Sequence, residues 1–427
     1  MYARDFLDTV TTSKENLLLL LVLLLASLLV GIEIPEGIAY VAVAAVYGIV
    51  LIICFVRGRL GIAYSRTFLY LIGVLWAIFV LNVALNPTPR SLLRGISFIV
   101  FSALTLFVVP GTFSREEFID ALSIVAVAVG LVAIPIGAST LLSTGSGFGV
   151  YATSGTLLGT GIELPVLMSI FENPNYLATL SALGLVASFG LADGSRRREI
   201  AILFGGVCLL SLVLSQGRAG FLALVGGGIV YIVYRIGGAR FATPVVVLGI
   251  LCAALFFVFA VVSIGGLRVP ESVLNNRQGL WSAAIAAISE RPFLGWGLID
   301  TPQILADHGA PTPAGHVFGT HNSYLRMFLI SGISGGVLYL GAIGYTLYRS
   351  LRVEENSQGS AGLPLALLVV VLIIHMFNGS TIFGLSFVSL FSALVIGYGQ
   401  QPSNRINITR KYSEISKKIC RQLEVKI

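Results

Sequence analysis

Charge is what this sequence contains least of. Charged side chains account for only 11% of the 427 residues, whereas hydrophobic side chains account for 56%. Soluble domains carry about 25% charged residues, so this composition excludes an ordinary water-soluble domain and indicates a polytopic membrane protein. No small-residue cleavage site follows the first apolar run, 16–30, and we therefore expect a first membrane span rather than a removed signal peptide.

Cysteines and metal-binding patterns are also scarce. The four cysteines, Cys54, Cys208, Cys252 and Cys420, are scattered and lack metal-ligand spacing. We expect three of them to be small hydrophobic residues in apolar runs and the fourth to be a thiol in the tail. The acidic residues expected outside form no close pair that would hold a divalent ion on a diphosphate, and no phosphate-binding glycine loop of the nucleotide-hydrolase type is present. The sequence thus predicts no metal and no cofactor.

Long apolar runs are abundant. A helix needs about 20 apolar residues to cross the hydrocarbon core of a bilayer. The candidate spans are 14–32, 38–56, 66–84, 91–110, 118–138, 164–192, 199–215, 217–236, 243–264, 322–349, 362–379 and 381–399. Pro165 and the Asn-Pro-Asn step at 173–175 interrupt the sixth, which is either a broken span or a short interfacial helix followed by a span. The expected fold is an all-α polytopic membrane protein with about 12 transmembrane helices.

The basic residues orient these spans. With the N-terminus inside, 20 of the 27 lysines and arginines fall in cytoplasmic segments, as the positive-inside rule requires. Both termini are then cytoplasmic, and the net charge of +7 needs no nucleic-acid partner. The chain divides into spans one to nine (1–264), one large extracytoplasmic loop with an interfacial helix (265–321), spans ten to twelve (322–399) and a basic tail (400–427). The tail either lies along the anionic inner leaflet or is solvated.

The first polar feature on the outer side is an arginine in a glycine-containing reversal. Arg218 lies in the segment LSQGRAG, 214–220, between the seventh and eighth expected spans. The glycines allow close approach of the backbone, and Arg218 opens a helix whose N-terminus carries partial positive charge. A guanidinium beside free helix N–H groups is a candidate anion site, whereas an arginine that snorkels to the membrane surface is the structural alternative.

The long polar excursion before the tenth span holds a second arginine and a histidine. Arg277 begins an amphipathic stretch, 277–289, that we expect to be a short helix on the membrane surface with Trp281 at headgroup level. His321 lies at the entrance to the tenth span. Near arginines an imidazole is disfavoured as a cation, so we expect His321 to be neutral and able to accept a proton from a sugar hydroxyl. A surface arginine and a capping histidine are the alternatives.

The other histidines have simpler interpretations. His308 and His316 lie in the same excursion without a helical frame, and we expect them to be loop residues. His375 lies in an apolar run, where a hydrogen-bonded core histidine is the default.

At these residues the chain resembles the O-antigen ligase and polymerase superfamily of membrane glycosyltransferases. The matching segments are SQGR at 215–218, Arg277 with Trp281 four residues on, RPFLGWG at 291–297, THNSYL at 320–325 and NPNYLA at 173–178. The likeness extends over about 160–345. Each motif alone is weak, and their order, their spacing and their shared side of the membrane make the match specific.

The resemblance implies a GT-C-like membrane fold and an inverting, metal-independent transfer. Members of the superfamily take a glycan from a polyprenyl diphosphate carrier at the outer face of the plasma (inner) membrane and pass it to a lipid A core or to another glycan. The essential arginines would correspond to Arg218 and Arg277, and the catalytic histidine to His321. Supporting residues would be Gln216, Asn322, Tyr324, Trp281 and Asn175.

Three functions follow as alternatives. The single modest excursion favours a ligase over a polymerase of the same superfamily, both of which serve the biosynthesis of cell-envelope polysaccharide such as lipopolysaccharide. A transporter or flippase for lipid-linked glycans would also need anion-binding arginines, but it should place its charges near the membrane midplane in broken helices. A non-catalytic assembly subunit explains the cluster of motifs least well.

Overall fold

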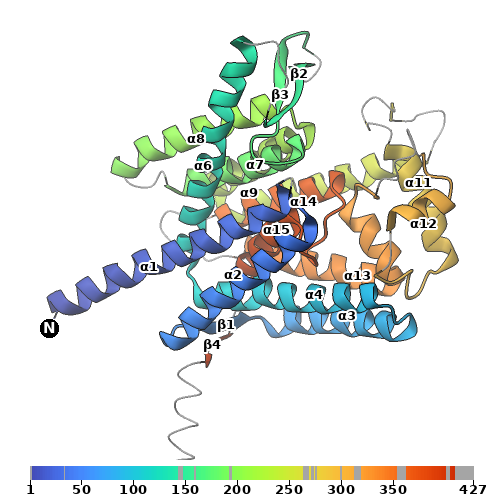
Figure 1. Ribbon diagram of the computed structural model, residues 1–427, viewed down its shortest axis with the longest axis horizontal. Coiled ribbons are helices and arrows are strands. Elements are labelled where there is room, and N and C mark those ends of the chain that lie inside the picture. The colour runs from blue at the N-terminus through green and yellow to red at the C-terminus, as the bar shows by residue number, and fades with distance from the viewer. Residues whose placement is uncertain are drawn as a thin grey trace, which may run out of the picture. The chain divides into compact units, whose positions relative to one another are not determined.

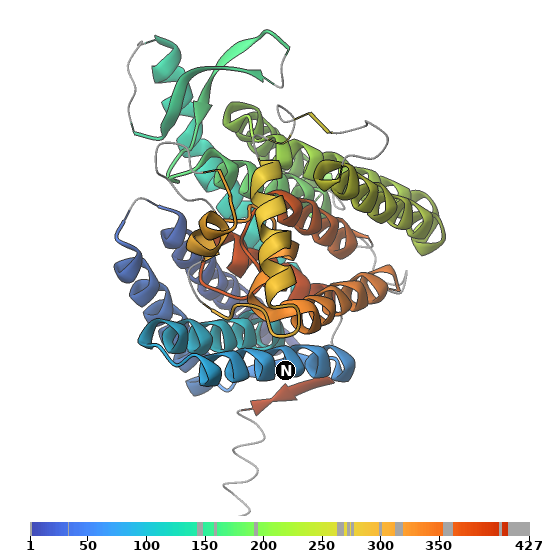
Figure 2. The same ribbon diagram turned by 90° about the vertical axis from the view of Figure 1, so that its right-hand side faces the viewer.

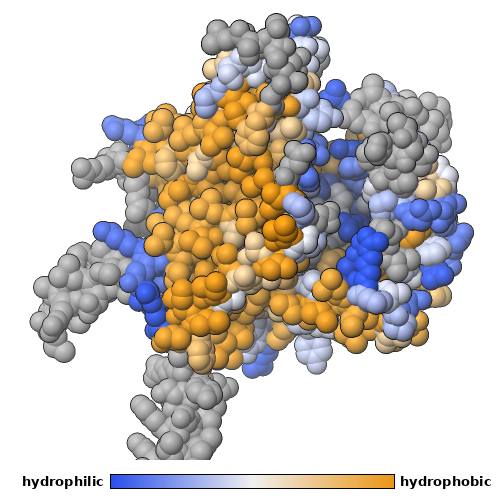
Figure 3. All heavy atoms as spheres, viewed as in Figure 1, coloured by the Kyte–Doolittle hydropathy of each residue, from blue (hydrophilic) through white to orange (hydrophobic). Residues whose placement is uncertain are grey.

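The computed structural model is mostly helical. It describes residues 2–32, 34–142, 148–157, 160–191, 195–262, 269–270, 274, 277–298, 301–311, 319–352, 362–400 and 404–408. Within these residues, nine helices are long and apolar enough to cross a membrane. Hydrophobic side chains cover much of the surface seen in Figure 3, as expected for helices that face lipid. The chain forms two compact units, one of 1–66, 102–217 and 385–427, and one of 67–101 and 218–384.

Unit 1 combines helices with two short antiparallel sheets (Figure 1). Its helices are α1 (Tyr2–Leu28), η1 (Leu29–Gly31), α2 (Glu36–Val56), η2 (Leu104–Val108), α5 (Val109–Thr112), α6 (Arg115–Leu142), α7 (Pro174–Leu191), α8 (Ser195–Ser215) and α15 (Phe387–Gly399). Its strands are β1 (Gly61–Tyr64), β2 (Val150–Thr156), β3 (Glu163–Leu167) and β4 (Asn404–Asn407). A capping box of Ser114 and Glu117 starts α6, and α7 packs between α6 and α8.

The strands correct the all-helical expectation in two places. The first part of the predicted sixth span is neither span nor interfacial helix, because 163–167 is strand β3, paired with β2, and the helix begins only at Pro174. A proline at the first helical position leaves no donor unpaired, which is why the chain turns helical there. In the expected tail, 404–407 pairs with 61–64 as strand β4. The rest of the tail, from 409 on, lies outside the described residues.

Unit 2 holds the helices around the polar excursion. Its helices are α3 (Arg66–Leu85), α4 (Pro89–Ala103), α9 (Arg218–Val261), α11 (Arg277–Glu290), α12 (Thr301–Asp307), α13 (Ser323–Leu351) and α14 (Leu363–Phe377). Figure 2 shows α11, in gold, beside the orange helix α13. The described part of the excursion therefore contains two helices, and α11 has nearly the predicted bounds.

Helix α9 is a hairpin of two helical arms. Gly237 and Gly238 leave the helical region, with φ of 61° at Gly238, and divide α9 into 218–236 and 239–261. In the first arm, Gly226 lies against Ile373 of α14, and Tyr234 lies against Gly362, just before the start of α14. In the second arm, the Phe256 ring is 6.2 Å from the Phe377 ring, at the other end of α14. The second arm must therefore run back along the first. The two arms correspond to the predicted spans 217–236 and 243–264.

Helix α13 bends sharply at Gly332. In a straight helix, with a rise of about 1.5 Å per residue, Tyr324 and Tyr339 would be about 22 Å apart. Their ring centroids are 6.3 Å apart, because Gly332 has φ of 65° and breaks the helix into a short arm and a long arm. The predicted tenth span, 322–349, is thus two arms. The last two predicted spans are also shorter than expected, with 15 residues in α14 and 13 in α15.

Candidate functional site

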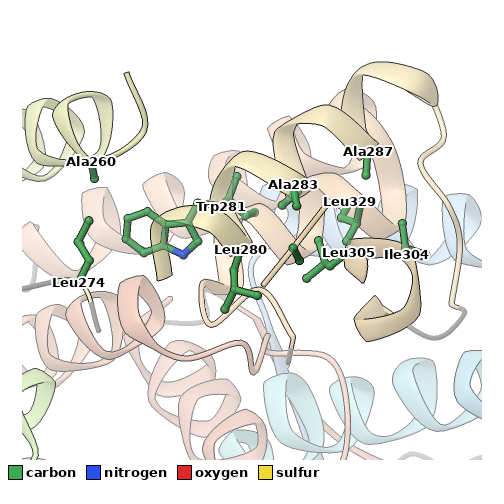
Figure 4. Close-up of a cluster of buried hydrophobic side chains, with 12 residues drawn as sticks. Ala260, Leu274, Leu280, Trp281, Ala283, Ala287, Ile304, Leu305 and Leu329 are labelled. Carbon is green, nitrogen blue, oxygen red and sulfur yellow. The ribbon is translucent and has the colours of Figure 1, made fainter. Parts of the chain in front are cut away.

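The site is built on the short arm of α13, the end of α14 and helix α11, all in unit 2. Trp281 of α11 is fully buried and packs 5.5 Å from the Phe257 ring, within the hydrophobic cluster drawn in Figure 4. Its indole Nε1–H donates to the carbonyl of Thr320 at 3.0 Å. Trp281 therefore lies in the protein interior rather than on an exposed face of α11, and its indole holds the backbone next to His321.

His321 adopts a backbone conformation that few residues other than glycine adopt. Its φ is 45°, in the left-handed region. On one side Thr320 donates through Oγ1 to the carbonyl of Asn322, at 2.9 Å. On the other side Asn322 caps α13, because its side chain accepts from the backbone N–H of Leu325 at 3.0 Å. The two contacts fix the imidazole-bearing residue at the entrance to the helix, and Asn322 is a cap rather than a free polar group.

A turn after α14 packs against His321. Ser323 Oγ donates to the carbonyl of Asn378 at 2.7 Å and also contacts that of Ser380, and Arg326 Nη1 donates to the carbonyl of Gly379 at 2.8 Å. A Cβ on Gly379 would lie 3.4 Å from the backbone nitrogen of His321. Sequence reasoning missed this role of Ser323 and Arg326. The sequence signal available for this role was that Ser323 and Arg326 are three residues apart in the first turn of the helix that follows His321.

Arg277 is a half-buried cation at the same place. Its guanidinium lies 5.8 Å above the centroid of the Phe377 ring, at the end of α14. Among the residues that the structure describes, no carboxylate forms an ion pair with it. Burial lowers the pKa of Arg277, and an arginine nevertheless keeps its proton at physiological pH. As far as the described residues show, the site therefore contains a fixed positive charge without a protein anion beside it.

The imidazole of His321 is neutral at pH 7. Burial, together with the positive charge of Arg277, lowers the pKa of His321 to about 4. The direction agrees with the sequence-based expectation, although burial is the larger cause. The electrostatic effect also shows that Arg277 and His321 are neighbours, so the structure brings together two of the three predicted site residues.

Arg218 is exposed at the first residue of α9. The antiparallel packing of α9 on α14 pairs Tyr234 with Gly362 and Gly226 with the segment from Val369 to Ile373. Continued for two more turns, the same register places Arg218 level with the residues just after Phe377. That is the end of α14 at which Arg277 and His321 lie.

Two of the predicted supporting residues belong to unit 1 and have structural contacts. Gln216, with φ of 51°, donates through Nε2 to the carbonyls of Gly155 at 3.1 Å and Leu164 at 2.9 Å. It thereby fastens the β2–β3 hairpin to the turn that precedes Arg218. Asn175 is exposed in the first turn of α7 and receives a cap from Asn173 Oδ1.

The remaining predicted residues are also held by the protein. Tyr324 donates through its hydroxyl to the carbonyl of Leu372 at 2.9 Å. His375 is fully buried and lies 3.3 Å from the Tyr339 hydroxyl, as expected for a core histidine. His308 follows α12, with Nε2 at 3.1 Å from Glu290 Oε1 and Nδ1 at 2.6 Å from the Ile304 carbonyl. His316 lies outside the described residues.

The segment RPFLGWG, 291–297, stabilises the bend in α13 through backbone hydrogen bonds. Gly332 breaks the helix, and the freed backbone groups pair with this segment: Trp296 N–H with the Leu329 carbonyl, Gly297 N–H with the Ile330 carbonyl, and Ile333 N–H with the Pro292 carbonyl. Asn82 Nδ2 adds bonds to the Leu294 and Ile330 carbonyls. Irregular backbone in a membrane protein survives only where protein satisfies it, so this motif is explained by structure.

Together these features define an integral membrane protein with a polar, cationic site at one end of its helices. Residues 200–340 match the family model described as O-antigen ligase, and this match supports the resemblance of that part of the chain to the O-antigen ligase superfamily. The matched segment includes Arg218, Arg277 and His321, whereas NPNYLA at 173–178 lies before it. No curated protein matches the chain.

Proposed function

We propose that the protein is a ligase-like glycosyltransferase that moves a glycan from a polyprenyl diphosphate carrier to an acceptor hydroxyl, such as one on a glycolipid core, at the extracytoplasmic face. The observation that carries the proposal is the pairing of Arg277 with the neutral His321. A half-buried guanidinium that lacks a carboxylate partner among the described residues suits an anionic substrate, and an uncharged imidazole beside it suits proton transfer.

The proposed step is a single displacement. The acceptor oxygen attacks the anomeric carbon as the bond from that carbon to the diphosphate oxygen breaks. The His321 imidazole takes the proton of the acceptor hydroxyl, and the diphosphate leaves with the electron pair. One displacement inverts the anomeric centre. In this step, side chains of the protein accept the proton and offset the negative charge of the leaving diphosphate.

In this scheme the two arginines together lower the activation free energy more than the imidazole does. Arg277 and Arg218 would each offer two parallel N–H donors to diphosphate oxygens as negative charge develops on the leaving group. A well-placed donor of this kind typically contributes on the order of 3–4 kcal/mol to a transition state. Base catalysis by the imidazole contributes roughly 10²–10⁴-fold.

The test is transfer by the purified full-length protein in liposomes, with lipid-linked glycan and candidate acceptors in the presence of a chelator. His321→Ala should bind the carrier as the wild type does and lose roughly 10²–10⁴-fold in transfer rate. His308→Gln is the matched control and should transfer normally, because His308 packs against Trp296 and Glu290 rather than at Arg277.

The products separate the candidates. One glycan added per acceptor supports a ligase, and a ladder of lengthening carrier-linked glycans supports a polymerase. Movement of intact carrier-linked glycan across the bilayer without any transfer product would replace the proposal with a transporter. A wild-type rate in His321→Ala would remove the base from the mechanism.

A further inference from the structure

One buried polar atom near the site has no hydrogen-bond partner within the part of the chain that the structure describes. Gln278, next to Arg277 in the first turn of α11, exposes only 3% of its surface. Its side-chain oxygen Oε1 is buried, and among the described residues it accepts no hydrogen bond. Leaving a buried amide oxygen unpaired destabilises the folded protein, so a group of this kind calls for an explanation.

Packing does not supply that explanation. The other buried residues of α11 are Leu280, Trp281 and three alanines, and they form an apolar cluster with α12 and α13 (Figure 4). A leucine at position 278 would satisfy such a core and remove the unpaired oxygen. Without a ligand, the buried amide of Gln278 therefore lowers the stability of the folded protein.

The position of Gln278 places it beside the reacting groups. Residues three apart on a helix have Cβ atoms about 5–6 Å apart. Gln278 stands three residues before Trp281, whose indole bonds to Thr320, and it directly follows Arg277. The amide thus lies within one helical turn of the residues that hold His321.

We propose that the Gln278 carboxamide oxygen accepts a hydrogen bond from a sugar hydroxyl of the substrate beside the reacting bond, which makes it a specificity-determining residue. The inference rests on the proposed glycosyl transfer. A neutral acceptor suits this place, because a carboxylate here would attract the Arg277 guanidinium away from a diphosphate. Sites built to bond a hydroxyl discriminate strongly against analogues that lack it, since the protein group is then left unpaired.

The test compares Gln278→Leu with Gln303→Leu in the full-length protein. Gln303 is an exposed glutamine of α12 that donates to Asp307 one turn on, and its change should leave both melting temperature and transfer at wild-type values. Gln278→Leu should melt at or above the wild-type temperature, because a buried unpaired oxygen is gone, and yet lose ten-fold or more in kcat/KM. Wild-type kcat/KM in Gln278→Leu would overturn the proposal.

A binding measurement separates this proposal from the proposed function. Polyprenyl diphosphate and polyprenyl diphosphate carrying the native sugar are added to wild type and Gln278→Leu, and melting temperatures are compared. If Gln278 contacts the donor sugar, the extra rise that the sugar causes in the wild type disappears in the variant, whether or not transfer occurs. If it contacts the acceptor, that rise is unchanged and the KM for acceptor increases. If the variant loses neither contact, the proposed role of Gln278 is refuted, and the proposed glycosyl transfer is unaffected.

Discussion

In the proposed mechanism, the transfer step depends on the protonation state of one imidazole, that of His321. His321 is held in a left-handed conformation between a capping asparagine and a tryptophan-bound carbonyl, beside an arginine. A free base whose pKa is far below 7 is a weak base, because base strength falls with pKa. Two negative charges from a diphosphate would offset the charge of Arg277, so the site can gain basicity when the donor arrives.

We therefore predict that the pKa of His321 depends on its partners. In the free protein the group should lose its neutral form only as the pH falls through about 4, and it should be uncharged throughout pH 5–8. Arg277→Gln should raise this pKa, and so should bound polyprenyl diphosphate. NMR titration of histidine-labelled protein, with the His321→Gln spectrum for assignment, measures each value. An imidazole that titrates near 6.5 and ignores both changes would contradict the account.

At this scale the sequence singled out the three residues proposed to react, but it did not reveal the contacts that hold them. Arg218, Arg277 and His321 were recognisable because polar residues are rare between apolar runs. The role of Trp281 was not, because an indole at a membrane surface and an indole in a protein core have the same local sequence. Ser323, Arg326 and Gln278 become visible only when α11, α13 and α14 are packed together, since their contacts or missing contacts join distant parts of the chain.

Elements in this protein break where glycine permits it. Gly332 bends α13, and the segment 292–297 occupies the space that a side chain would need: a Cβ on Gly332 would lie 2.2 Å from the Phe293 carbonyl oxygen. The bend brings the short arm, which follows His321, back to the long arm. Hydropathy alone cannot reveal it, because both arms are apolar and continuous in sequence.

Gly332→Ala should therefore destabilise the protein by at least about 2 kcal/mol, through backbone strain and overpacking. Gly344→Ala in the same helix is the matched control. Nothing lies within 4 Å of its added Cβ, and alanine favours a helix over glycine by about 1 kcal/mol. Thermal melting should thus fall for the first variant and stay level or rise for the second. Equal melting temperatures would mean that α13 is not bent in this way.

At the scale of elements, most helices were predicted and the exceptions have physical causes. Both arms of α9 and the start of α7 follow from glycine and proline positions. Strand β3 was missed, because a short apolar run next to proline predicts helix and strand equally well. The short lengths of α14 and α15 were missed because the backbone of the link between them, 378–386, is held by the side chains of Asn378, Thr381 and Ser386.

At the scale of the molecule, the distribution of charge in unit 2 distinguishes its two ends. Arg235 and Arg240 flank the turn of the α9 hairpin, whereas Arg218, Arg277 and His321 lie at or level with the opposite end of the same helices. The twelve-span arrangement with cytoplasmic termini remains a prediction, because it depends on loops on both sides of the bilayer.

Labelling of single cysteines in intact cells tests that arrangement. In a protein without its native cysteines, Ser282→Cys on the exposed side of α11 should react with a membrane-impermeant maleimide. Ile236→Cys, at the exposed turn of α9, should react only after the membrane is opened. The reverse pattern would place the site in the cytoplasm and exclude a carrier displayed outside.

The central claim is that two arginines and one neutral histidine act on a single carrier headgroup. The most direct measurement is a structure of His321→Ala with a bound polyprenyl diphosphate-linked glycan, the substitution being chosen to prevent transfer. We expect diphosphate oxygens within hydrogen-bond distance of both Arg218 and Arg277, with the anomeric carbon facing position 321. A diphosphate bound elsewhere, or touching neither arginine, would contradict the account.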